Sequence, residues 1–196
     1  MHVHTTNEPR RFLFVLAGGR RDGNTEALAR RAAADLPADV EQRWIRLDEY
    51  PLPVFADITD RDAPRPAPEG NARALLDATL AATDLVTASP VYWYSLSSAA
   101  KLYLDYWSHW LRLRELRFQE RMARKTLWSV SALADEDLSV AEPLARSLKL
   151  TAQYLGARWG GALLGVGSWP GDVLRDADAL RRAESFFAAA DAAVPA

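Results

Sequence analysis

The residues best suited to chemistry lie near the amino terminus, where an apolar run leads through glycines and arginines into a helical pattern. Residues 12–28 read FLFVLAGGRRDGNTEAL. Glycines let backbone N–H groups approach a ligand closely, and the amino end of the following helix carries a partial positive charge. Arg20 and Arg21 add full charges, and Asn24 or Thr25 can cap the helix. The stretch therefore predicts a site for a phosphate group.

The spacing of this turn nearly matches the loop that binds nucleoside triphosphates. Gly18 and Gly23 stand as far apart as in that loop, but Asn24 occupies the place of its lysine. Because that lysine contacts the terminal phosphates, its absence argues against a triphosphate. A plain strand-to-helix turn at Gly23 and Asn24, with no ligand, is the other interpretation of the same residues.

A second candidate stretch, residues 89–98, reads SPVYWYSLSS and contains the consecutive aromatic residues Tyr92, Trp93 and Tyr94. Three adjacent rings cannot all enter one core, because successive side chains point in different directions. We expect at least one ring to anchor the loop, while others, or their backbone, face a ligand or a partner.

A third glycine-containing stretch, residues 165–171, has the wrong spacing for a dinucleotide-binding loop and is interrupted by Pro170. We interpret it as a loop at the end of the sheet. Trp169 would then lie near the cofactor or near a neighbouring subunit, and the sequence does not choose between these places.

Alternating strand and helix patterns position these stretches. Strands are expected at residues 11–17, 40–47, 84–88, 126–131 and 162–166, and helices at 24–36, 71–82, 97–116, 138–155 and 175–192. The alternation predicts an α/β fold in three layers, a five-stranded parallel sheet between helices. In strand order 2-1-3-4-5, a ligand binds beyond the carboxyl ends of strands one and three. The first two candidate stretches would then be neighbours.

Length and composition fit a single domain over residues 1–196, of which 49% are hydrophobic. Residues 1–10 are expected to form a flexible amino terminus and residues 51–70 a long proline-rich loop. The charged run at residues 112–124 is expected to form a solvated helix end and connector.

Charge and cysteine content exclude several classes of function. The 24 basic and 26 acidic residues give a net charge of −2, which argues against a nucleic-acid-binding protein. The chain has no cysteine, which excludes disulfides, thiolate metal sites and a catalytic thiol. No apolar run reaches the roughly 20 residues of a membrane span, and no secretion signal is recognisable, so a cytoplasmic protein is expected. No metal site is predicted.

The expected helix at residues 97–116 carries aromatic side chains on more than one face, at Tyr103, Tyr106, Trp107 and Trp110. Either the helix is unusually enclosed or it packs on a second copy of the chain. We favour a homodimer whose active site includes residues of both chains. His109 on this helix is interpreted as a packed or solvent-facing residue rather than a proton donor.

Both candidate stretches resemble the family of NAD(P)H-dependent FMN reductases and quinone reductases, which have the flavodoxin-like fold. The family's first loop, Gly-Ser-x-Arg-x-x-Gly-Asn-Thr, is matched by residues 17–25. Its second motif, Ser-Pro-Val-Tyr-Trp followed by Lys-x-x-x-Asp, is met by residues 89–93, Lys101 and Asp105. The resemblance covers nearly the whole chain and implies FMN and NAD(P)H as cofactors.

The resemblance also implies roles for individual residues, with Arg20, Asn24 and Thr25 as phosphate contacts. The residues implied to bind FMN are Gly18, Arg20, Gly23, Asn24, Thr25, Pro90, Val91, Tyr92, Trp93 and Tyr94, the last five bordering the isoalloxazine mostly through backbone groups. No catalytic residue is assigned, because the flavin supplies the chemistry. Gly18 departs from the family serine, which removes a hydrogen bond that contributes roughly 1.5 to 3 kcal/mol.

The implied enzyme passes electrons from NAD(P)H through FMN to a quinone, a flavin or another small acceptor. An electron-carrier flavodoxin is disfavoured, because such carriers are strongly acidic and this chain is nearly neutral. A flavodoxin-like scaffold or interaction domain with weak or lost FMN binding is the second interpretation, and Gly18 is the residue that supports it.

Overall fold

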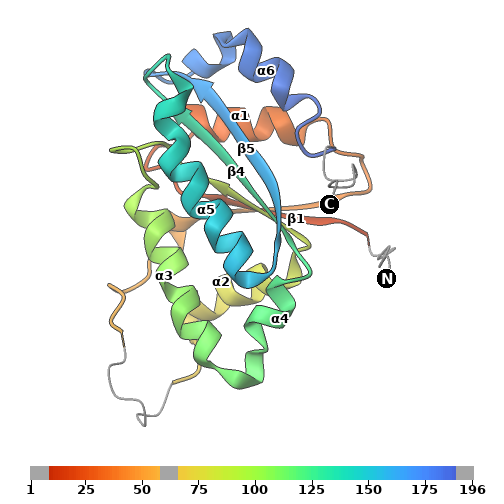
Figure 1. Cartoon of the computed structure of the whole chain (residues 1–196), viewed down its shortest axis with the longest axis vertical. Helices are drawn as coiled ribbons and strands as arrows, with labels where there is room; N and C mark the ends of the chain where they lie inside the picture. Colours follow the sequence, from red (N-terminus) through yellow and green to blue (C-terminus); the bar gives the residue numbers. More distant parts are fainter. Residues whose placement is uncertain (1–8, 58–65, 189–196) are drawn as a thin grey trace.

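A five-stranded parallel sheet forms the centre of the molecule (Figure 1). The computed structural model describes residues 9–57 and 66–188. The strands are β1 (Arg11–Leu16), β2 (Glu41–Arg46), β3 (Asp84–Ala88), β4 (Thr126–Leu133) and β5 (Arg158–Val166). Their spatial order is β2-β1-β3-β4-β5, and every neighbouring pair is parallel. The predicted sheet and its strand order are confirmed.

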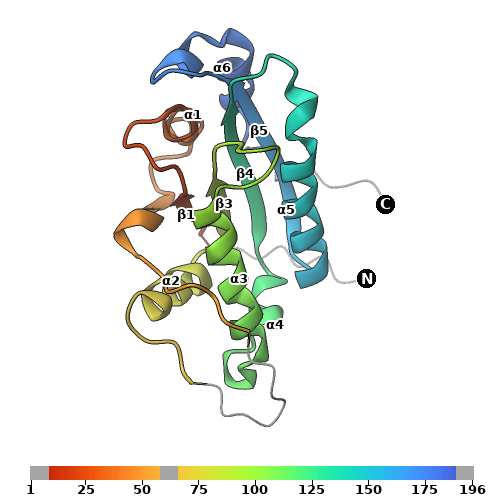
Figure 2. The ribbon, with the colours of Figure 1, turned by 90° about the vertical axis from the view of Figure 1, so that its left-hand side faces the viewer.

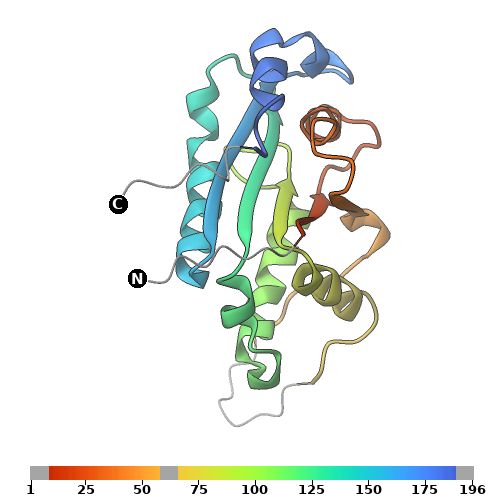
Figure 3. The ribbon, with the colours of Figure 1, turned by 90° about the vertical axis from the view of Figure 1, so that its right-hand side faces the viewer.

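Helices cover both faces of the sheet. One face carries α1 (Asn24–Ala33) and α6 (Ala177–Ala183), and the other carries α2 (Gly70–Ala81), α3 (Ser98–Arg112), α4 (Phe118–Met122) and α5 (Glu142–Leu155). The edge-on views show α1 and α5 on opposite sides of the strands (Figures 2 and 3). The predicted three layers are therefore present. No helix in the described ranges is long and apolar enough to cross a membrane.

The side chains of β1 show why the sheet needs both helical layers. Phe12 and Phe14 pack into the cluster beneath α1 and α6, whereas Leu13 and Val15 pack into the cluster beneath α2, α3 and α5. Successive residues of a strand point to opposite faces, and all four side chains are buried. The continuous apolar run thus indicated, correctly, a strand covered on both sides.

Several predicted boundaries differ from the observed ones. β5 begins at Arg158 rather than at residue 162. Its first half was missed because it contains Gly160, over which the Trp128 ring lies and where a Cβ atom would stand 2.3 Å from that ring. The strand must therefore have glycine where an apolar residue would have signalled it. Helix α1 ends at Ala33, before the predicted residue 36. Helix α6 spans Ala177–Ala183, and residues 189–192 of the predicted last helix lie outside the described residues.

The prediction of a solvated connector at residues 112–124 is wrong in part, because this run contains α4. Phe118 and Met122 of α4 are buried. The Phe118 ring packs against Trp107 and Trp110 of α3, each with ring centroids 5.7 Å apart. The charged residues between the two apolar positions masked the helix in the sequence.

The aromatic residues of α3 are covered within one chain. Tyr103, Trp107 and Trp110 are buried in the core between α3, α2 and α5. On the other side, the Tyr106 hydroxyl donates to the Pro53 carbonyl oxygen at 3.0 Å and its ring packs on that of a neighbouring phenylalanine. The enclosed alternative therefore explains the distribution of aromatics, which gives no argument for a second subunit.

The proline-rich segment lies along α3. Its described parts, residues 51–57 and 66–69, contain no helix or strand, as predicted. The Nε2 atom of His109 lies 3.0 Å from the Pro66 carbonyl oxygen, so His109 contacts this segment. The predicted flexible amino terminus lies outside the described residues apart from residues 9 and 10, and the single domain stays a prediction.

Candidate functional site

A cavity of about 290 Å³ opens at the carboxyl end of the sheet, where β1 and β3 lie side by side. Its walls come from the loops that follow four strands, namely residues 18–26 after β1, 90–92 after β3, 132–134 at the end of β4 and 167–170 after β5. Of the predicted site residues, the cavity is lined by Gly18, Arg20, Gly23, Asn24, Thr25, Pro90, Val91 and Tyr92. The two candidate stretches are neighbours, as predicted.

The amino end of α1 opens on this cavity without a side-chain cap. Gly23 is the N-cap residue, with extended backbone (φ −71°, ψ 165°), and glycine has no side chain to accept from the first helical N–H groups. The prediction that Asn24 or Thr25 caps the helix is therefore wrong. N–H groups left without an acceptor at a helix start form an anion-binding site, which the helix dipole reinforces.

The side chains of Asn24 and Thr25 join α1 to loops that are distant in sequence. Asn24 Nδ2 donates to the Trp169 carbonyl oxygen at 2.9 Å, and Asn24 Oδ1 accepts from the Val173 amide at 3.4 Å. The Thr25 hydroxyl accepts from the Ala132 amide at 3.3 Å. These contacts hold the end of β4 and the loop after β5 against the start of α1, and so they shape the cavity.

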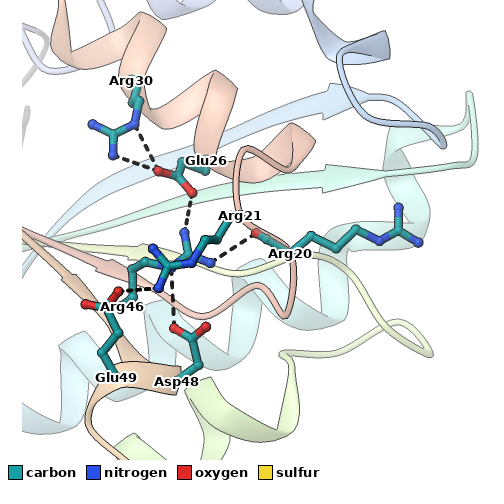
Figure 4. Close-up of polar contacts among 7 residues, drawn as sticks. All are labelled: Arg20, Arg21, Glu26, Arg30, Arg46, Asp48 and Glu49. Atoms are coloured by element: carbon teal, nitrogen blue, oxygen red, sulfur yellow. Dashed lines mark hydrogen bonds and ion pairs between the residues drawn. The ribbon is translucent and has the colours of Figure 1, made fainter.

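The two arginines of the first loop are used differently. Arg21 Nη2 lies 2.7 Å from Glu49 Oε1, and this hydrogen bond and charge raise the pKa of Arg21. Arg20 lines the cavity, and its guanidinium points away from the Arg21 pair (Figure 4). No hydrogen bond or ion pair joins the Arg20 guanidinium to another described residue, and none joins it to the six residues drawn with it in Figure 4. Its charge is thus left for a ligand.

A buried carboxylate borders the same cavity. Glu26, in the first turn of α1, accepts from Arg30 at 3.0 and 2.7 Å and lies 2.5 Å from Arg46 Nη1. Burial alone would raise the pKa of Glu26, but the hydrogen bonds and charges of Arg30 and Arg46 hold it below its ordinary value. The carboxylate is therefore ionised and engaged by two arginines, and the cavity stays open beside it.

Sequence reasoning missed Arg46, which also lines the cavity. Arg46 is the last residue of β2, which pairs with β1, and the first loop continues from β1. A charged residue at the carboxyl end of the strand beside β1 was the available signal. It was hidden because the side chains of β2 show no clean alternation.

The aromatic residues after β3 form a tight turn at the cavity mouth. Tyr92 and Ser95 exchange two backbone hydrogen bonds of 3.0 Å, and both central residues have left-handed backbone, with φ 49° at Trp93 and 63° at Tyr94. Bulky residues in this conformation are strained by roughly 1 to 2 kcal/mol each. Tyr92, Trp93 and Tyr94 are 52%, 92% and 57% exposed, so the loop presents ring surface outward. The expectation that at least one ring anchors the loop is wrong, because the buried Leu96 does so instead. The cavity lining includes Tyr92 but neither Trp93 nor Tyr94.

The residues present fit an FMN phosphate and its ring. An uncapped helix start and an unpaired arginine suit a dianion, and the chain passes Gly18 and Gly19 without crowding, since a Cβ on Gly18 would find its nearest atom at 3.8 Å. Backbone and apolar side chains from the loops after β3 and β4 form the adjoining wall.

An uncapped helix start beside an apolar wall, at the point where the winding of this sheet reverses, is the arrangement of the flavodoxin-like class of proteins. Within that class, the chain belongs to the family of NADPH-dependent FMN reductases, whose model matches residues 11–158. The predicted family is confirmed, and FMN and NAD(P)H are the cofactors of this family, as predicted.

Individual relatives agree with this family. The chain is 29% identical over 180 residues to YwqN of Bacillus subtilis (strain 168), which is named as an NAD(P)H-dependent FMN-containing oxidoreductase. The aligned residues cover 91% of this chain and 97% of YwqN. The solved structure of the Trp repressor binding protein from Bacillus subtilis has a TM-score of 0.71 at 27% identity, over 89% of this chain and 96% of that one. The NAD(P)H:quinone oxidoreductase from Methanothermobacter marburgensis shares the fold, with a TM-score of 0.71 at 15% identity, over 96% and 100% of the two chains.

Proposed function

We propose that this chain passes electrons from NAD(P)H, through FMN held in the cavity, to a quinone, a free flavin or another small acceptor. The observation that carries the proposal is the uncapped start of α1, which opens on the cavity beside the unpaired Arg20. When bound, FMN supplies the redox chemistry, accepting a hydride from NAD(P)H and passing electrons to the acceptor. Apart from the glycine at position 18, no observation on the described residues favours the scaffold alternative.

The first loop and α1 would hold the phosphate. Backbone N–H groups of Asn24 and Thr25 are the donors at the uncapped helix end, and the Arg20 guanidinium supplies a full positive charge. The side chain of Asn24 is already engaged by the loop after β5, so its contact with phosphate would come from its backbone. Gly18 and Gly23 would let the chain approach the phosphate closely.

The loop after β3 would border the ring. The amides of Val91 and Tyr92 already donate to Ala132 and Ser95, at 3.1 and 3.0 Å, so these two N–H groups are not available to a ligand. The amides of Trp93 and Tyr94 have no recorded acceptor in the described part of the chain. Because Trp93 and Tyr94 do not line the cavity itself, we assign their amides as donors only to a part of the ring that would project beyond the cavity mouth.

We also propose that the chain works as a homodimer. Trp93, Tyr94 and Trp169 stand 92%, 57% and 75% exposed around the cavity loops, and a second copy would remove this aromatic surface from water. The cytoplasmic localisation predicted from the sequence stays a prediction, consistent with a need for NAD(P)H. No nucleic-acid partner is proposed.

The test uses the purified full-length chain. FMN should bind saturably, seen as quenching of its fluorescence, and the FMN-loaded chain should oxidise NADPH or NADH faster when a quinone is added. Bound FMN without nicotinamide oxidation would favour a carrier, and no saturable FMN binding would favour a scaffold. Sedimentation velocity at micromolar concentration should show a dimer, and a strict monomer would contradict the shared site.

A further inference from the structure

Arg46 connects three parts of the candidate FMN site (Figure 4). It stands at the end of β2, its side chain is 11% exposed, and it lines the cavity. One terminal nitrogen lies 2.5 Å from Glu26 Oε2 on α1, and the other donates to the Arg20 carbonyl oxygen at 3.1 Å. The Arg46 side chain thus connects β2 both to the first loop and to α1, the helix that follows this loop.

The hydrogen bond from Arg46 to the Arg20 carbonyl oxygen holds the backbone of the first loop against the end of β2. This loop has no helix or strand between β1 and α1, and the side chain of Arg21 within it turns outward to Glu49. With its carbonyl held by Arg46, Arg20 extends its own side chain in the opposite direction, away from the buried ion pairs (Figure 4). The hydrogen bond therefore holds the Arg20 backbone, from which the free guanidinium extends.

The ion pair with Glu26 has a second consequence. An ionised carboxylate in the first turn of α1 stands next to the place where a phosphate dianion would bind, and like charges repel. Arg30 and Arg46 both contact this carboxylate, and Arg30 is itself held over the Trp44 ring, 4.4 Å from its centroid. Arg46 Nε also lies 3.4 Å from Asp48 Oδ1, so the cluster of two arginines and two carboxylates has no net charge, and Glu26 no longer acts as an uncompensated negative charge beside the phosphate position.

We propose that Arg46 is a positioning residue of the FMN phosphate site. It pairs with the Glu26 carboxylate and donates to the Arg20 carbonyl oxygen, so that the first loop is preorganised to bind an anion. It acts through Glu26 and the first loop, and no contact between Arg46 and the cofactor is required. The inference rests on the proposed function, since it assumes that FMN occupies this cavity.

The test compares FMN with riboflavin, which has the same ring without the phosphate. Arg46→Met keeps the length of the side chain but removes its charge and donors. We expect this variant of the full-length chain to raise the FMN dissociation constant tenfold or more, while that of riboflavin changes less than about threefold. The double variant Glu26→Gln/Arg46→Met removes the repelling carboxylate and should recover part of the lost FMN affinity.

Two further variants separate positioning from general stability. Arg43→Met, at an exposed site on the same strand, is the matched control and should leave both dissociation constants unchanged. Arg46→Lys keeps the charge beside Glu26 but cannot hold two acceptors with one planar group, so its FMN affinity should fall between wild type and Arg46→Met. This variant serves as the test if Arg46→Met does not fold.

The ratio of the two dissociation constants decides the outcome. If Arg46→Met, or Arg46→Lys in its place, weakens FMN and riboflavin by the same factor, Arg46 is only structural and the inference is overturned. The same holds if the FMN affinity does not change. If the wild-type chain itself binds no FMN, the proposed function fails together with the inference, so the two failures are distinguishable.

Discussion

The two ends of the sheet treat their polar groups in opposite ways. At the amino end, the buried Asp84 carboxylate accepts from Arg10 at 2.7 and 3.2 Å and from Trp128 Nε1 at 2.9 Å. Lys125, also buried there, donates to the carbonyl oxygens of Leu80 and Ala82. Each of these buried polar groups at the amino end of the sheet therefore has a protein partner.

At the carboxyl end, several groups are left without protein partners. The start of α1 has no side-chain cap, and the Arg20 guanidinium has no described partner. Buried polar groups that are satisfied within the protein contribute to folding, whereas groups left unsatisfied at a cavity are available to a ligand. The amino end of the sheet therefore contributes to stability, and the carboxyl end presents groups for binding.

The largest expected effect follows from removing the carboxylate at the amino end. Asp84→Ala removes the acceptor of the Trp128 indole and the carboxylate paired with Arg10, which keeps the Phe187 carbonyl oxygen as an acceptor, and this should lower the free energy of unfolding by roughly 3 kcal/mol. Urea titration measures this loss. The FMN dissociation constant of the folded variant should stay at the wild-type value. A tenfold change in it would contradict the separation between a stabilising amino end and a ligand-binding carboxyl end of the sheet.

The next effect compares two adjacent arginines at the carboxyl end. Arg20→Ala removes the unpaired charge at the cavity and should raise the FMN dissociation constant by about tenfold or more, with little change in melting temperature. Arg21→Ala is the matched control, because Arg21 is already paired with Glu49. Equal effects of the two substitutions on FMN binding would show that Arg20 has no special role, and Arg181→Ala serves as a distant control.

A gain of binding is expected from Gly18→Ser. A Cβ at this position would stand 3.8 Å from Pro90 Cδ, an ordinary contact, so the serine of the family motif fits without displacement. Its hydroxyl adds one donor to a charged acceptor, and the FMN dissociation constant should fall by up to about tenfold. Fluorescence titration measures it. Riboflavin binding should not improve, and an equal gain for both flavins would place the serine away from the phosphate.

The smallest effect concerns pH. The second proton of a phosphate monoester has a pKa near about 6, so FMN affinity should fall a few-fold as the pH drops through that value. Glu26 does not contribute there, since its pKa is held below the ordinary 4.5, and the stabilisation from its ion pairs is lost only as the pH falls below that value. Titrations with FMN and riboflavin at several pH values test this, and riboflavin should show no step near 6.

Much of the fold could be predicted from the sequence because its signals are local. The apolar run of β1 and the alternation of strands with helices predicted the parallel sheet, whereas the strand order came from the fold class rather than from a local signal. The glycine-arginine loop was singled out as a phosphate site, and its residues do line the cavity. α4 could not be predicted in the same way. Its two apolar residues are recognised only by what they pack against on α3.

The remaining features of the site depend on contacts between distant residues. Asn24 looks like a helix cap in the sequence, yet its side chain bonds to a carbonyl 145 residues away. Thr25 likewise reaches a strand 107 residues further on. Arg46 is one arginine among many until β2 is placed beside β1, because only then does it reach the first loop.

The aromatic turn after β3 has a consequence for engineering. Asn-Gly is the dipeptide that two consecutive left-handed positions favour, and placing it at Trp93 and Tyr94 would relax the backbone. The same substitutions would remove the aromatic side chains of Trp93 and Tyr94 from the cavity mouth. A thermostabilised version of this chain obtained there would resist heat better and reduce its substrates more slowly.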